Sequence, residues 1–139
     1  MLEQRMNTPF LALRWTYGLV PLLAGLDKFF NLLTDWTAYL SPAVQRMLPI
    51  APTTFMYFVG IVEMAVGIMV LTHWTRLGAY LAAVWLTAIA VNLVVAGVLD
   101  VAVRDLALAV GAYTLARFVE VREPAASIDL SGANARSVA

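Results

Sequence analysis

The stretch that decides the fold is PTTFMYFVGIVEMAVGIMVLT, residues 52–72, in which Glu63 is the single charged side chain. About 20 predominantly apolar residues in a helix are long enough to cross the hydrocarbon core of a bilayer. A backbone in lipid must satisfy its hydrogen bonds internally, so a crossing segment of this kind is helical. The stretch therefore predicts a transmembrane helix with a carboxyl group near mid-membrane.

Three further stretches have the same apolar character: residues 9–33, 77–99 and 101–119. Together the four spans predict an all-α integral membrane protein, a four-helix bundle that occupies residues 8–119. The polar residues 120–139 are expected to form a disordered C-terminal tail. The first span is not interpreted as a cleaved signal peptide, because Arg14, Asp27 and Lys28 interrupt it. Met6 is an alternative to Met1 as the start of translation.

The composition excludes several classes of protein. The chain has 139 residues, of which 62% are hydrophobic and 13% charged, whereas soluble domains carry about 25% charged residues. Nine basic residues balance nine acidic ones, so no basic surface for nucleic acid is expected. The chain has no cysteine and a single histidine, His73, so neither a metal site nor a resident cofactor is evident.

The connection between the first two spans is expected to contain a short helix. Ser41 is a suitable N-cap and Pro42 suits the first helical position, so the helix should run to about Leu48. We expect it to lie in the membrane interface or to cap the bundle. Trp85 is deep enough to line a pocket, whereas the other tryptophans and two tyrosines suit an interfacial belt: Trp15, Trp36, Trp74, Tyr39 and Tyr57.

The basic residues predict the orientation of the bundle. With four spans, both termini lie on one side of the membrane. That side has Arg5, Arg14, Arg76, Arg117, Arg122 and Arg136, and the other side has Lys28, Arg46 and Arg104. Because positively charged loops stay inside, both termini are expected to be cytoplasmic.

The helical period gathers small and charged residues on one face of each span. The face of the first span is Arg14, Gly18, Pro21, Gly25 and Lys28, and that of the second is Gly60, Glu63 and Gly67. Small residues allow helix backbones to approach closely in lipid. The pattern therefore predicts a compact bundle with its charges turned inward.

The charged residues within the spans have two interpretations. Asp27, Lys28, Arg104 and Asp105 lie near the outer ends of two spans and are hypothesised to form structural ion pairs. Glu63 must be either protonated or paired with a basic residue, and the sequence leaves both options open. An intramembrane charge of this kind marks either a packing contact or a functional site.

Three motifs in order resemble the DoxX family of small bacterial membrane proteins. The first span carries Arg14 and then Gly25-Leu26-Asp27-Lys28-Phe29, the second carries Glu63 followed by Gly67, and the fourth begins with Arg104-Asp105. The resemblance covers residues 10–118 and implies a four-helix protein of the bacterial inner membrane. It also implies a link to quinone-dependent redox systems, because founding relatives are small subunits of a thiosulfate:quinone or quinol oxidase system.

Three functions are compatible with this pattern. The first is an accessory subunit that docks quinone or a partner redox protein, without a cofactor of its own and with no catalytic residue assigned. Its candidate ligand-binding residues are Arg14, Lys28, Glu63, Trp85, Asn92 and Arg104. The second is a purely structural or assembly subunit. The third is a carrier of a small solute or proton that uses Glu63, which the small size of the bundle disfavours. A homo-oligomer or a complex with a membrane or redox protein is expected.

Overall fold

The fold is that of a computed structural model, which describes the backbone of residues 2–137 and the side chains of residues 5–122. The described chain is helical and contains no strand, which confirms the all-α class. Its elements in chain order are α1 (Leu2–Asp27), the 3-10 helix η1 (Trp36–Tyr39), α2 (Pro42–Met47), α3 (Pro52–Leu71), α4 (Thr75–Ala96) and α5 (Leu99–Ser137).

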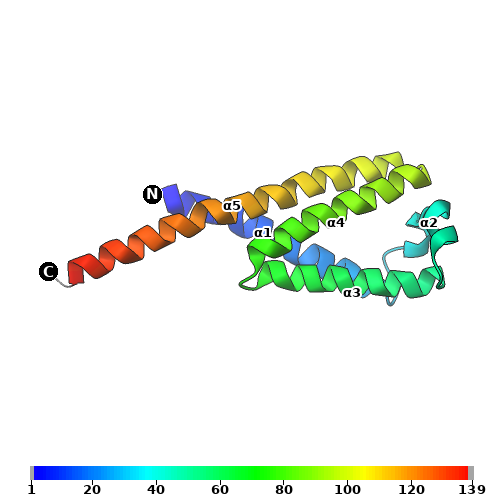
Figure 1. The fold of residues 1–139 in the computed structure, drawn as a ribbon, viewed down its shortest axis with the longest axis horizontal. Coiled ribbons are helices and arrows are strands. Elements are labelled where there is room, and N and C mark those ends of the chain that lie inside the picture. The colour runs from blue at the N-terminus through cyan, green and yellow to red at the C-terminus, as the bar shows by residue number, and fades with distance from the viewer. Residues whose placement is uncertain (1, 138–139) are drawn as a thin grey trace.

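The four long helices form two tightly packed pairs. α1 packs mainly on α3, and α4 packs along α5, with fewer contacts between the pairs. Figure 1 shows both termini at one end of the molecule and α2 at the other. The predicted four-helix bundle with a short helix between its first two members is therefore confirmed.

Three of the described helices are long and apolar enough to cross a membrane: Arg5–Asp27, Pro52–Leu71 and Thr75–Ala96. Many of their leucine and valine side chains are exposed, as expected for a surface that faces lipid. α5 is not among the three, because Arg104, Asp105 and Arg117 interrupt its apolar sequence. The crossing of residues 101–119 therefore stays a prediction.

The first helix differs from the predicted span of residues 9–33 at both ends. It begins upstream of Pro9, in a segment of good helix formers. It ends at Asp27, because the Asp27 carboxylate accepts hydrogen bonds from the backbone N–H groups of Leu32 and Leu33 and folds the chain back. Asn31 has a positive φ of 52° in this turn. The apolar residues after Asp27 therefore form a loop and do not continue the membrane helix.

The connection after this turn contains the predicted short helix. The Ser41 hydroxyl accepts from the Val44 N–H at 3.3 Å, and Pro42 is the first residue of α2. This helix, which ends at Met47, is preceded by η1, which the sequence did not predict.

The C-terminal segment also differs from expectation. α5 continues to Ser137 and projects beyond the bundle in Figure 1, whereas the sequence predicts a disordered tail over residues 120–139. The segment contains several alanines, whose helix propensity is high, and the prediction from polarity did not weigh them. The domain limit at residue 119 stays a prediction.

The α1–α3 crossing depends on glycine, as the predicted small-residue faces indicate. A Cβ atom added to Gly25 would lie 2.5 Å from the carbonyl oxygen of Gly60, and one added to Gly60 would lie 2.6 Å from that of Gly25. A Cβ atom added to Gly67 would lie 2.6 Å from the carbonyl oxygen of Gly18. These contacts bring the two backbones together and place the end of α1 beside the middle of α3.

Candidate functional site

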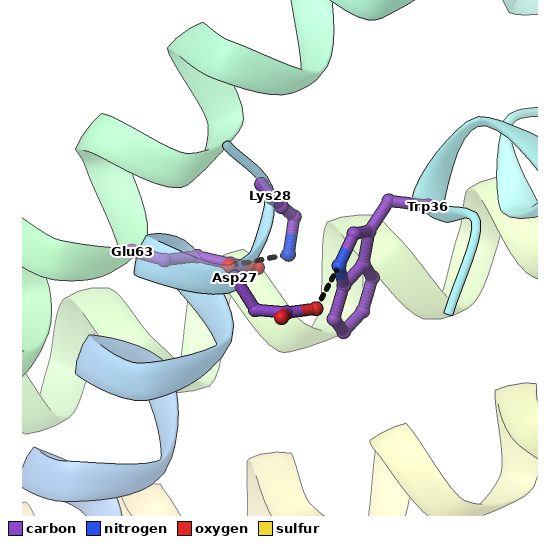
Figure 2. A network of polar contacts seen from close by, with 4 residues as sticks. All are labelled: Asp27, Lys28, Trp36 and Glu63. Atoms are coloured by element: carbon purple, nitrogen blue, oxygen red, sulfur yellow. Dashed lines mark hydrogen bonds and ion pairs between the residues drawn. The ribbon is translucent and has the colours of Figure 1, made fainter. Parts of the chain in front are cut away.

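A buried ion pair lies at the centre of the candidate site. The Lys28 Nζ atom donates a hydrogen bond of 2.6 Å to Glu63 Oε2, and the two side chains are only 4% and 10% exposed. Lys28 follows the last residue of α1, and Glu63 lies near the middle of α3 (Figure 2). The glycine crossing creates this arrangement, because Lys28 also packs against Gly60. Glu63 is therefore paired, which was one of the two options that the sequence left open.

Trp36 joins this ion pair to Asp27. The Lys28 Nζ atom lies 3.7 Å from the centre of the Trp36 ring, a cation–π contact. The Trp36 Nε1–H donates to Asp27 Oδ2 at 2.9 Å (Figure 2). Because the same carboxylate ends α1, one residue determines both the helix end and the position of the indole. We call Asp27, Lys28, Trp36 and Glu63 the outer polar cluster.

Trp85 of α4 lies against this cluster. Its indole lies near the Glu63 carboxylate, and its Nε1–H is buried and has no hydrogen-bond partner within the described part of the chain. A buried donor without a partner is uncommon in proteins. The site thus has a buried carboxylate, a buried ammonium group and one unused N–H donor.

Arg14 does not belong to the outer polar cluster. Its guanidinium donates to the backbone carbonyl groups of Val70, Leu71 and Thr72, at 3.1, 2.7 and 2.8 Å. These carbonyls lie at the C-terminal end of α3, where a helix leaves its last C=O groups unpaired and where a cation is favourable. Arg14 therefore caps α3 at the opposite end of the α1–α3 pair.

Asn92 holds the connecting segment against α4. Its Oδ1 accepts from the backbone N–H of Ser41 at 3.0 Å, and its Nδ2 donates to the carbonyl of Tyr39 at 2.8 Å. The acceptor oxygen and the donor nitrogen of the Asn92 amide thus each make a hydrogen bond within the chain. Asn92 thus fixes η1 and α2 over the bundle, and through η1 it helps to hold Trp36 in place.

Arg104 is also separate from the cluster. Its Nε lies 3.6 Å from Asp105 Oδ1 of the same helix, and its side chain is 68% exposed. Of the four residues hypothesised to form structural ion pairs, Arg104 and Asp105 thus contact each other, whereas Lys28 pairs with Glu63. Lys28 binds Glu63 because the glycine crossing brings α1 onto α3 rather than onto α5.

A metal site finds no support in the described side chains. Within residues 5–122, no group of three or more His, Cys, Asp and Glu side chains is arranged to hold a metal ion.

The comparisons with known proteins agree with the motifs around this site. The DoxX family model matches residues 10–99 of the chain. The chain belongs to the DoxX family. No curated protein and no solved structure matches it.

The matched region of this DoxX chain includes the outer polar cluster, Arg14 and Trp85, but ends before Arg104 and Asp105. The two motifs around Lys28 and Glu63 thus lie inside the match, and the motif that opens α5 lies outside it. The family match supports the first three long helices most directly.

Two residues of the DoxX chain have roles that the sequence did not indicate. Trp36 was expected at the membrane interface, and no spacing rule relates a loop indole to Asp27 and Lys28. Tyr17 is buried, and its hydroxyl donates to the carbonyl of Leu108 at 2.7 Å, which ties α1 to α5. Its position three residues after Arg14 places it beside the small-residue face, so the helical period was a usable signal.

Proposed function

We propose that this DoxX protein docks a quinone headgroup beside the outer polar cluster and serves as an accessory subunit of a redox-linked membrane system. The observation that carries the proposal is the unused Nε1–H of Trp85 next to the buried Lys28–Glu63 pair. The family resemblance to quinone-linked subunits supports the same ligand class. The chain supplies the binding site, and a partner protein supplies the redox centre.

The chemistry of the three groups fits a quinone. Each quinone carbonyl oxygen accepts a hydrogen bond, and two donors lie near Glu63: Trp85 Nε1 on α4 and Lys28 Nζ directly after α1. The Glu63 carboxylate accepts hydrogen bonds and is suited to a quinol hydroxyl. Of the six residues expected to bind a ligand, the proposal uses these three; Arg14 and Asn92 bind backbone groups, and Arg104 is exposed.

The test measures how much quinone the purified full chain retains and binds. We expect Trp85→Phe to reduce binding about ten-fold, the effect of one lost buried hydrogen bond, and Glu63→Gln to weaken it as well. Asp35→Asn is the matched control, because this exposed carboxylate caps η1 near the site without touching it. Equal binding by the wild type and Trp85→Phe, or no binding by the wild type, would refute the proposal.

A structural or assembly role is the second candidate. It is favoured by Arg14 and Asn92, whose polar groups bind backbone groups and stabilise the fold. The double variant Lys28→Met/Glu63→Leu separates the two roles. If it folds and still supports a partner complex but loses quinone, the docking role holds; if it folds and changes neither property, the role is structural.

We further propose that both termini are cytoplasmic in a bacterial inner membrane. The end of the bundle that holds both termini also has the larger share of the basic side chains: Arg5, Arg14, Arg76, Arg117 and Arg122. Because the chain has no cysteine, single cysteines can be introduced at Thr8 and Ala43 without background labelling. In intact cells a membrane-impermeant maleimide should label Ala43→Cys and not Thr8→Cys; the reverse pattern would invert the topology.

A further inference from the structure

An apolar groove between α4 and α5 is separate from the proposed quinone site. Its volume is about 650 Å³, and it runs from Tyr80 to Val91 on α4 and from Leu106 to Tyr113 on α5. Figure 1 shows these two helices side by side over this length. Small side chains are part of its lining, among them Ala88. The groove therefore suits a narrow, flexible apolar chain.

One end of this groove is polar. The rings of Tyr80 and Tyr113 meet edge to face there, with centres 6.1 Å apart. The Tyr80 hydroxyl donates to Glu120 Oε1 at 2.8 Å, and Arg117 Nη1 donates to Glu120 Oε2 at 2.5 Å. Glu120 thereby holds Arg117, whose side chain is still 57% exposed. A guanidinium has five N–H donors, so it can bind Glu120 and a second anion together.

A second positive charge lies at the same end. Arg76 is exposed in the first turn of α4, one turn before Tyr80, and Arg117 follows Tyr113 by one turn of α5. The helical period places both arginines on the groove side of their helices. Guanidinium groups match the geometry of phosphate. The polar end is therefore complementary to an anionic phosphate group.

The length of the groove distinguishes between a lipid chain and a neighbouring helix. From Tyr80 to Val91, α4 rises about 16 Å, roughly half of the ~30 Å hydrocarbon thickness. An acyl chain from one leaflet occupies that depth, whereas a helix of a second copy would pack along both leaflets. The arginines lie at the end of α4 where a headgroup of the same leaflet would be.

We infer that the α4–α5 groove is a phospholipid site. One acyl chain lies along the groove, and the phosphate binds the Arg117 guanidinium at its polar end, beside Arg76. Tyr80 and Glu120 hold the Arg117 guanidinium in position. The site is independent of the quinone proposal, because it shares no residue with the outer polar cluster.

The test is a titration of the delipidated full chain with phosphatidylglycerol, followed by native mass spectrometry. Arg117→Gln should weaken the first bound lipid about ten-fold, as expected for the loss of a charge-assisted hydrogen bond. Arg46→Gln is the matched control, because Arg46 is exposed on α2 at the opposite end of the molecule. Ala88→Phe should fill the groove and abolish the first binding event, and Ala65→Phe on the exposed side of α3 should not.

Four outcomes would overturn the inference. Equal losses in Arg117→Gln and Arg46→Gln would show nonspecific attraction, and unchanged binding in Ala88→Phe would show that the groove is unused. Displacement of the lipid by inorganic phosphate at equal concentration would show that the polar end of the groove binds a free anion rather than a lipid headgroup. A change of oligomeric state in Ala88→Phe with lipid binding intact would assign the groove to a second copy.

Discussion

The α1–α3 pair and the α4–α5 pair are packed by different means. In the first pair the backbones meet directly at Gly25 and Gly60, and a buried ion pair joins Lys28 to Glu63. In the second pair the buried contacts come from small apolar side chains, chiefly alanine, and its ion pair of Arg104 and Asp105 lies within one helix.

The difference shows that burial determines how much an ion pair contributes to the stability of a helix pair. Helices in lipid lack a hydrophobic driving force for association, so close packing and polar contacts must hold them together. The α1–α3 pair combines close packing and a polar contact at the same place. The glycines bring Lys28 and Glu63 together, and the pairing of these two charges offsets the cost of burying them. The α4–α5 pair depends on side-chain packing and should tolerate changes to its charges.

The largest expected effect comes from breaking the buried ion pair. Lys28→Met leaves the Glu63 carboxylate buried without its partner, which should cost about 3–5 kcal/mol of unfolding free energy. The double variant Lys28→Met/Glu63→Leu should recover most of this loss, because neither charge is then buried. Denaturant titration in mixed micelles measures both. A double variant as unstable as Lys28→Met would show that the loss comes from packing rather than from an unpaired charge.

The next effect concerns the glycine contact. In Gly60→Ala the added methyl group would press on the carbonyl oxygen of Gly25 and separate α1 from α3, at a cost of about 1–3 kcal/mol. The same titration checks it, with Ala65→Leu on the exposed side of α3 as the control of unchanged stability. Equal behaviour of the two variants would mean that the close backbone approach contributes nothing to stability.

An effect of similar size is expected at Asn92, through which α4 holds the segment that connects α1 to α3. Asn92→Ala leaves the Ser41 N–H and the Tyr39 carbonyl without their partner, at a cost of about 1–3 kcal/mol. Hydrogen exchange should rise in residues 36–48 while it stays unchanged in α3. Thr114→Ala removes a local hydrogen bond to Val110 and serves as the control. Unchanged exchange in the connection would exclude Asn92 as its anchor.

The smallest effect is expected at the exposed charge of the second pair. Arg104→Gln removes a 3.6 Å contact from a side chain that is mostly exposed, and such pairs contribute about 0–1 kcal/mol. The measurement is again the unfolding free energy. A loss as large as that of Lys28→Met would erase the contrast between the two pairs.

The sequence predicted the small-residue faces, the short helix after Ser41 and the inward position of Glu63. These features depend on local rules: helical periodicity, capping and the cost of a charge in lipid. It misplaced the end of α1, because hydropathy continued past Asp27 while the Asp27 carboxylate bound the backbone of the following turn. It also grouped Lys28 with Asp105, because depth in the membrane does not specify which helices are neighbours.

By itself, the sequence determined that the chain is a helical membrane protein whose charges within the spans need partners, since length, hydropathy and periodicity suffice for that. Only the tertiary structure decided which partners they find. Lys28 faces Glu63, Trp36 covers Lys28, and Arg14 caps α3 because glycine contacts set the position of α1 on α3. Such contacts join residues far apart in the chain, and no local spacing encodes them.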